Sequence, residues 1–164
     1  MASQGDDDKD LAALSLLADV LPPAQPQASA RARLLAALKG PARFAPLARE
    51  IADTFTVPVA AVLAGLARID DDSAWLGAPS PGPSILPVHG RVVISRLPAG
   101  TRIPQHAHKT REVTYVLDGL LISDGTPHRR ASCMDMAPGT EHALQVADDE
   151  DCIVVFCQFP AASI

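Results

Sequence analysis

From Gly90 onward the sequence is a succession of short aliphatic and β-branched runs separated by glycine, proline and acidic turns. The runs are GRVVISRL, REVTYVL, GLLISD, HALQV and CIVVFCQF. Strands of this length and spacing are typical of an antiparallel β-barrel or sandwich. Because the chain contains only one tryptophan, one tyrosine and four phenylalanines, its core must be built mainly from Ala, Val, Leu and Ile.

The first 70 residues follow a different pattern, in which apolar residues recur at helical spacing. Four helices are predicted, with the stripes Leu11, Leu14, Leu17 and Leu21, then Leu34, Leu35 and Leu38, then Phe44, Leu47, Ala48, Ile51 and Phe55, and finally Val59, Val62, Leu63, Leu66 and Ile69. Ser29 and Thr56 are the predicted N-caps of the second and fourth helices. Such stripes usually form the core of their own domain, and the alternative is that one of them docks on a partner protein or a second copy.

Between the two patterns lies the proline-rich run GAPSPGPSILP, which is typical of a linker or loop. The sequence therefore predicts an α+β chain in three parts. Residues 1–72 form a helical region and candidate interaction module, residues 73–88 form a Pro/Gly-rich linker, and residues 89–164 form an antiparallel β-barrel.

Charge and composition exclude several functional classes. The net charge of -5 argues against direct binding to nucleic acid, which requires clustered Lys and Arg. No apolar run approaches the ~20 residues of a membrane span, and the acidic start MASQGDDDKD lacks the positive charge of a signal peptide. We therefore expect a cytoplasmic protein that contacts neither nucleic acid nor membrane.

The segment TRIPQHAHKTRE contains a candidate metal site. His106 and His108 are two residues apart, so on an extended strand both imidazoles project from one face, and Glu112 has the same parity. His142 follows a turn some thirty residues later, where a neighbouring strand can bring it alongside. Three imidazoles and one carboxylate suit a borderline divalent ion such as zinc, iron, manganese, nickel or copper.

The other histidines and the cysteines receive no functional assignment. His89 and His128 lie beside proline, glycine or arginine in predicted turns, where exposed surface residues are the usual finding. Cys152 and Cys157 lie in an apolar strand and are predicted to be inert buried thiols, and Cys133 has no evident activating cation within its motif.

The spacing of the candidate ligands resembles a known motif. Gly100, His106, His108, Glu112 and Gly119 match the first cupin motif, G-x5-H-x-H-x3-E-x6-G, at every position. The resemblance implies a jelly-roll barrel whose expected metal ligands are His106, His108, Glu112 and His142.

The second cupin motif is matched more loosely. Pro138, Gly139 and His142 resemble its proline, glycine and histidine, although the proline is displaced by one position. Ala131 stands where a glycine is usual, and Val146 replaces the final asparagine. These differences concern turn geometry more than metal ligation.

The stretches LPPAQPQASARARLLAALKGPARFAP and AWLGAPSPG, together with VLDGLLISDG, resemble the cupin-containing zinc anti-sigma factors (ChrR-like) over roughly residues 11–157. The resemblance implies a helical anti-sigma region before a metal-binding cupin that senses an oxidative signal. It also implies a sigma factor or another protein as the partner of the N-terminal helices. The family's N-terminal HxxxCxxC zinc motif is absent, since no His or Cys precedes His89.

Two functional hypotheses follow. The favoured one is a metal-binding regulatory or sensor protein, with zinc as the expected metal and a homo-oligomeric state. The alternative is a small single-domain cupin metalloenzyme, a dioxygenase acting on a diketone-like substrate. Four protein ligands complete a tetrahedral zinc site but leave two octahedral positions open on iron or manganese, so metal identity discriminates between the hypotheses. No catalytic residue is assigned.

Overall fold

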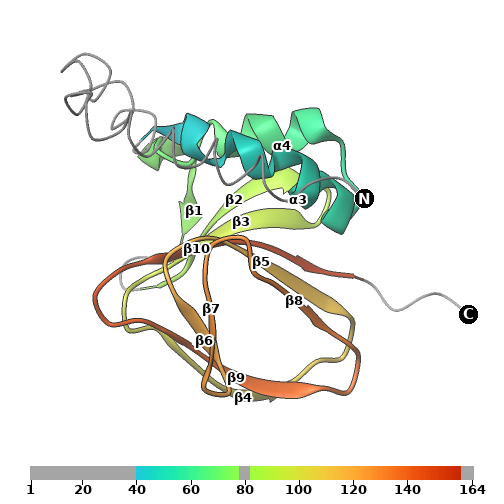
Figure 1. Ribbon diagram of the computed structural model, residues 1–164, viewed down its shortest axis with the longest axis vertical. Coiled ribbons are helices and arrows are strands. Elements are labelled where there is room, and N and C mark those ends of the chain that lie inside the picture. Colours follow the sequence, from blue (N-terminus) through green and yellow to red (C-terminus); the bar gives the residue numbers. More distant parts are fainter. Residues whose placement is uncertain (1–39, 78–81, 160–164) are drawn as a thin grey trace, which may run out of the picture. The chain divides into compact units, whose positions relative to one another are not determined.

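The computed structural model describes residues 40–77 and 82–159 of the chain, shown in colour in Figure 1. All described residues belong to one compact unit, residues 37–164. The two helices predicted before Gly40 lie outside the described residues. Within the described part of the chain, no helix is both long enough and apolar enough to cross a membrane.

Short helices precede the strands. They are the 3₁₀ helix η1 (Pro41–Leu47), α3 (Ala48–Phe55), α4 (Val59–Leu66) and the 3₁₀ turn η2 (Asp72–Ala74). The strands are β1 (Leu76–Gly77), β2 (Ser84–His89), β3 (Val92–Leu97), β4 (Arg102–Ala107), β5 (Glu112–Asp118), β6 (Leu121–Ser123), β7 (Thr126–His128), β8 (Cys133–Met136), β9 (Glu141–Val146) and β10 (Cys152–Gln158). This order confirms the predicted α+β fold.

The strands form two antiparallel sheets. One has the order β1-β2-β3-β10-β5-β8 and the other β4-β9-β6-β7. The described residues therefore form a double-sheet jelly roll with two separate hydrogen-bond ladders, and no closed barrel is formed. Apolar residues from both sheets form an inner core, whose members are Leu97, Val116, Leu121, Met134, Leu144, Val146, Cys152 and Val154.

The helices α3 and α4 cover the other face of the six-stranded sheet (Figure 1). The side chains of Ile51, Phe55 and Leu66 are at most 2% exposed and share one apolar core with Ile94 and Val155 of that sheet. The predicted stripes of the third and fourth helices are thus largely core residues. Leu63 is an exception, because it is 42% exposed.

The predicted helix cap at Thr56 is wrong. Thr56 ends α3 in the left-handed conformation, with φ of 55°, and its N–H group bonds the carbonyl of Ala52. Pro58 holds the N-cap position of α4 in an extended conformation. The left-handed residue is needed because the chain must leave one helix and enter the next within three residues.

The segment predicted as a linker, residues 73–88, contains the last two residues of η2, all of β1 and nearly all of β2. Leu86 of β2 is fully buried against the helices. Pro87 is tolerated in β2 because β1 pairs only with Ser84 and Ile85, which leaves the rest of β2 as an edge. Pro87 is therefore compatible with an edge strand, although the proline-rich run was interpreted as a linker or loop.

Candidate metal centre

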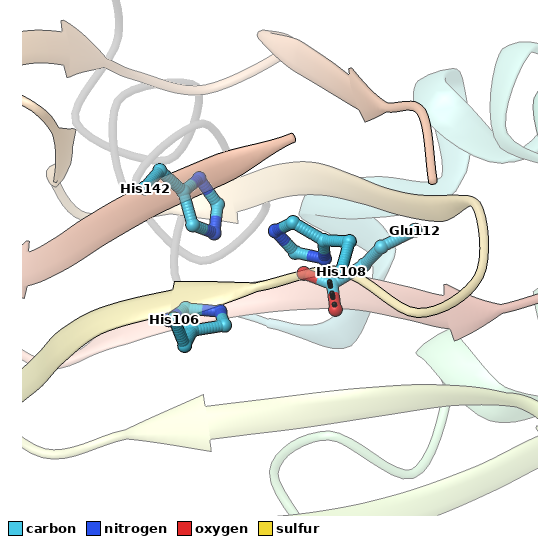
Figure 2. A group of neighbouring side chains, drawn as sticks. All are labelled: His106, His108, Glu112 and His142. Carbon is cyan, nitrogen blue, oxygen red and sulfur yellow. Dashed lines mark ion pairs between the residues drawn. The ribbon is translucent and has the colours of Figure 1, made fainter. Parts of the chain in front are cut away.

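The structure brings all four predicted ligand residues together. Potential ligand atoms of His106, His108, Glu112 and His142 lie within 4.8 Å of one another. Figure 2 shows the three imidazole rings and the carboxylate turned toward a common centre. The ring centroids are 4.7 to 5.0 Å apart. In the part of the chain that the structure describes, this is the one cluster of its kind, and it includes neither His89 nor His128.

His106 and His142 come together through strand pairing. β4 pairs with β9 in antiparallel register, and His106 lies directly opposite His142. The expectation that a neighbouring strand would carry His142 to the first two histidines is thereby met.

His108 and Glu112 reach the cluster by a different route from the one predicted. β4 ends at Ala107 and β5 begins at Glu112, so the two residues do not share one continuous strand with His106. The turn between them carries the chain from the four-stranded to the six-stranded sheet. The cluster therefore lies between the two sheets, and the argument from strand parity was wrong beyond Ala107.

Backbone hydrogen bonds fix the start of this turn. The N–H group of His108 donates to the carbonyl of Thr140 at 2.9 Å, and the N–H group of Gly139 donates to the carbonyl of His108 at 2.8 Å. Gly139 has φ of 85°, a conformation that glycine adopts without strain. The Pro-Gly turn of the second cupin motif thus holds His108 in place.

The three imidazoles make their polar contacts through Nδ1, which leaves the Nε2 atoms free to act as ligands. Nδ1 of His106 lies 2.9 Å from the carbonyl of Pro104, and because a carbonyl only accepts, this nitrogen carries the proton. Nδ1 of His142 contacts the hydroxyl of Ser123 at 3.1 Å, and Nδ1 of His108 lies 3.3 Å from Oε2 of Glu112.

Two of these Nε2 atoms lack a hydrogen-bond partner in the part of the chain that the structure describes. The Nε2 atoms of His108 and His142 are buried and have no hydrogen-bond partner among the described residues. A buried polar atom without a partner costs about 1 to 3 kcal/mol. A metal ion bound between the rings would remove that penalty, so the donor set fits a borderline divalent ion.

Electrostatics favour the neutral imidazole at His142. Burial lowers its pKa, and the nearby His108 and His106 lower it further. The neutral ring is the form that binds metal.

Glu112 is held by a residue that the sequence interpretation missed. The side-chain amide of Gln158 donates to Oε2 of Glu112 at 3.1 Å, and Gln158 lies opposite Glu112 in the β5–β10 register. Ser123 was missed as well. Ser123 lies in the stretch VLDGLLISDG and Gln158 lies in no motif, but the contact of each with a proposed ligand is recognised only through the strand pairing.

A cavity of about 280 Å³ reaches the cluster from one side. His106, Glu112, Thr114 and Gln158 line its polar part, whereas the more deeply buried His108 and His142 do not line it. Tyr115 belongs instead to the helix-covered core.

The cysteines lie outside the cluster. Cys152 and Cys157 are buried free thiols, as predicted, and Cys133 is exposed. Burial raises the pKa of Cys152 to about 12 and also raises that of Cys157. The pKa of Cys133 is raised by desolvation and by Asp135. Raised pKa values keep these thiols protonated, which disfavours thiolate chemistry.

The two facing sheets, with a His/Glu cluster between them, define a protein with the cupin fold. A chain in the crystal structure of Rhodobacter sphaeroides SigE in complex with the anti-sigma ChrR is similar over 90% of this chain and 75% of that chain, with 22% identity and a TM-score of 0.51. At this identity the likeness concerns the fold.

Two further solved structures are similar over little more than half of the chain. An RmlC-like cupin from Shewanella frigidimarina has 17% identity and a TM-score of 0.46 over 56% of this chain and 89% of that chain. An acetylacetone dioxygenase from Acinetobacter johnsonii has 16% identity and a TM-score of 0.45 over 55% and 71%, respectively. No protein-family model and no curated protein sequence matches this chain.

Proposed function

We propose that this chain is a metal-binding cupin protein with a regulatory or sensor role, in which His106, His108, Glu112 and His142 hold one divalent ion, zinc above all. The observation that carries the proposal is the pair of buried Nε2 atoms without hydrogen-bond partners, which face a third imidazole and a carboxylate. A bound ion would supply positive charge and Lewis acidity between the two sheets. The chain would supply neutral, oriented imidazoles and a carboxylate held by Gln158.

The composition of the cavity supports the regulatory role. Among the described residues that line it, His106 and Glu112 are the ionisable ones, and the other polar groups are Ser95, Thr114 and Gln158. Any general acid or base would then have to be one of the proposed metal ligands. Catalysis of proton transfer normally needs a positioned group with a suitable pKa, and no separate group of this kind lines the cavity in the described part of the chain.

The proposed partner is a sigma factor or another protein, bound through the N-terminal helical region. The similarity to a chain of the SigE–ChrR complex supports this proposal because it covers 90% of the present chain and is not confined to the strands. The inward faces of α3 and α4 are already buried against the sheet. A partner would therefore use other surfaces, such as those around the exposed Leu63. We further propose that the protein is cytoplasmic and forms a homo-oligomer. Light scattering of the purified chain would test the oligomeric state.

The second candidate is a small metalloenzyme, a dioxygenase acting on a diketone-like substrate. The observation that favours it is the cavity, because His106 and Glu112 line a space that a small molecule can enter. With iron or manganese, four protein ligands would leave two octahedral positions open.

Metal analysis tests both candidates. Protein purified without chelator is expected to contain about one zinc ion per chain, and His108→Ala should lose it while circular dichroism shows an intact fold. Undiminished metal in the variant would contradict the ligand assignment.

Iron-loaded protein offered pentane-2,4-dione is expected to consume no oxygen above a metal-free control. Uptake that is abolished by Glu112→Gln would instead establish the enzyme.

A further inference from the structure

The cavity at the cluster continues into a second one that opens to the surface. The outer cavity has a volume of about 520 Å³, and Pro83, Ser95, Phe156 and Gln158 line both. The two therefore adjoin one another, and a ligand could extend from the cluster to the surface. Volumes of this size are within the range of small-molecule sites.

The chemistry of the walls changes along this path. The inner cavity has a polar part, formed by His106 and Glu112 of the cluster together with Thr114 and Gln158. The rest of the inner cavity is largely apolar, with Leu97, Val154 and Phe156 among its lining side chains, and Phe156 also lines the outer cavity. Such a surface stabilises a hydrocarbon or aromatic segment by removing it from water.

The outer end carries a fixed positive charge. Arg91, in the turn between β2 and β3, lines the outer cavity beside Val93 and the 42%-exposed Ile85. It is the one arginine or lysine lining either cavity in the described part of the chain. None of the ion pairs among residues 40–77 and 82–159 involves Arg91. Its guanidinium is thus available to a carboxylate, for which the planar fork is well suited.

We propose that this two-part cavity binds an organic acid of medium length, with a carboxylate at Arg91, an apolar middle against Phe156 and an oxygen donor directed to the metal. The inference rests on the proposed metal function, because the inner end would bind an oxygen donor as a fifth ligand of the ion held by the cluster, and zinc can expand from four to five ligands. It assigns Arg91 as a specificity-determining residue and identifies a ligand class for the sensor or enzyme.

The proposal can be tested by calorimetry on the zinc-loaded full chain. The probes are linear dicarboxylates from butanedioate to dodecanedioate, each compared with the monocarboxylate of equal length. At least one dicarboxylate is expected to bind about tenfold more tightly than its monocarboxylate. Arg91→Gln should remove about that factor, and Arg91→Lys should retain part of it, since the positive charge remains.

Arg102→Gln provides the matched control. Arg102 is exposed and lines neither of the two adjoining cavities. Its replacement by Gln removes the same charge as Arg91→Gln does. This variant should bind the dicarboxylates as the wild type does. Removal of zinc should also weaken their binding by about tenfold, because the inner oxygen donor would lose its partner.

The outcomes separate this inference from the proposed function. Elemental analysis before and after each titration reports whether the chain holds metal. A chain without metal would overturn the proposed function and this inference together. A fully loaded chain would overturn this inference alone if it showed no preference for dicarboxylates, if Arg91→Gln and Arg102→Gln behaved alike, or if zinc removal left binding unchanged.

Discussion

The turn between β7 and β8 contains a residue in an unfavourable backbone conformation. Ala131 has φ of 66°, the left-handed region in which an L-residue costs roughly 1 to 2 kcal/mol. Its N–H group donates to the carbonyl of Val116 at 2.9 Å, so the turn geometry is fixed by the sheet. This is the position at which the second cupin motif usually has a glycine. We therefore expect Ala131→Gly to stabilise the protein.

The magnitude follows from two opposing contributions. Glycine relieves the left-handed strain but increases the conformational freedom of the unfolded chain, at a cost of about 0.4 to 1 kcal/mol. Because Ala131 is exposed, loss of its methyl group removes little buried surface. The net increase in the free energy of unfolding should be about 1 kcal/mol, or about 2 to 4 °C in Tm.

The assay is thermal and urea denaturation followed by circular dichroism. Ala137→Gly is the control, because Ala137 is an exposed turn residue that lacks a positive φ. That variant should lose roughly 0.5 kcal/mol, since only the unfolded-state contribution remains. If both variants are destabilised to the same extent, the strain argument for Ala131 is refuted.

Three other outcomes are expected. Gln158→Leu should weaken zinc binding about tenfold in competition with a chelator, because Glu112 loses the donor that orients it. The control Gln145→Leu, at a residue away from the cluster, should leave zinc binding unchanged. Equal zinc affinities of the two variants would contradict the role of Gln158. A chain beginning at Ser73 should aggregate or lose its cooperative unfolding transition, because it exposes the sheet face that α3 and α4 cover. If circular dichroism gave this shortened chain the Tm of the wild type, the stabilising role of the helices would be contradicted. Metal-free protein should lose stability as the pH falls from about 7 to 5, because the lowered pKa of His142 means that the unfolded state binds more protons in that range. In urea titrations, the free energy of unfolding of His142→Gln should depend less strongly on pH than that of the wild type.

The sequence by itself determined the candidate ligands and the general order of elements. Local periodicity predicts β3, β5, β6, β9 and β10, and it predicts the buried stripe of α3, because side-chain direction along a strand or helix repeats with a fixed period. The spacing of His106, His108 and Glu112 identified the cluster although the strand breaks between them. The motif was informative because the turn after Ala107 has a length that returns Glu112 to the same centre.

Only the tertiary structure decided how these parts meet. The division of the strands into two sheets placed the cluster between β4 and β5, and the β5–β10 register placed Gln158 beside Glu112. The packing of α3 and α4 on the six-stranded sheet likewise has no local signal, because an apolar stripe does not indicate which surface will cover it. These features depend on contacts between residues far apart in the chain, whereas periodicity and spacing describe only neighbours in sequence. The adjoining cavities and the position of Arg91 at their outer end belong to the same category.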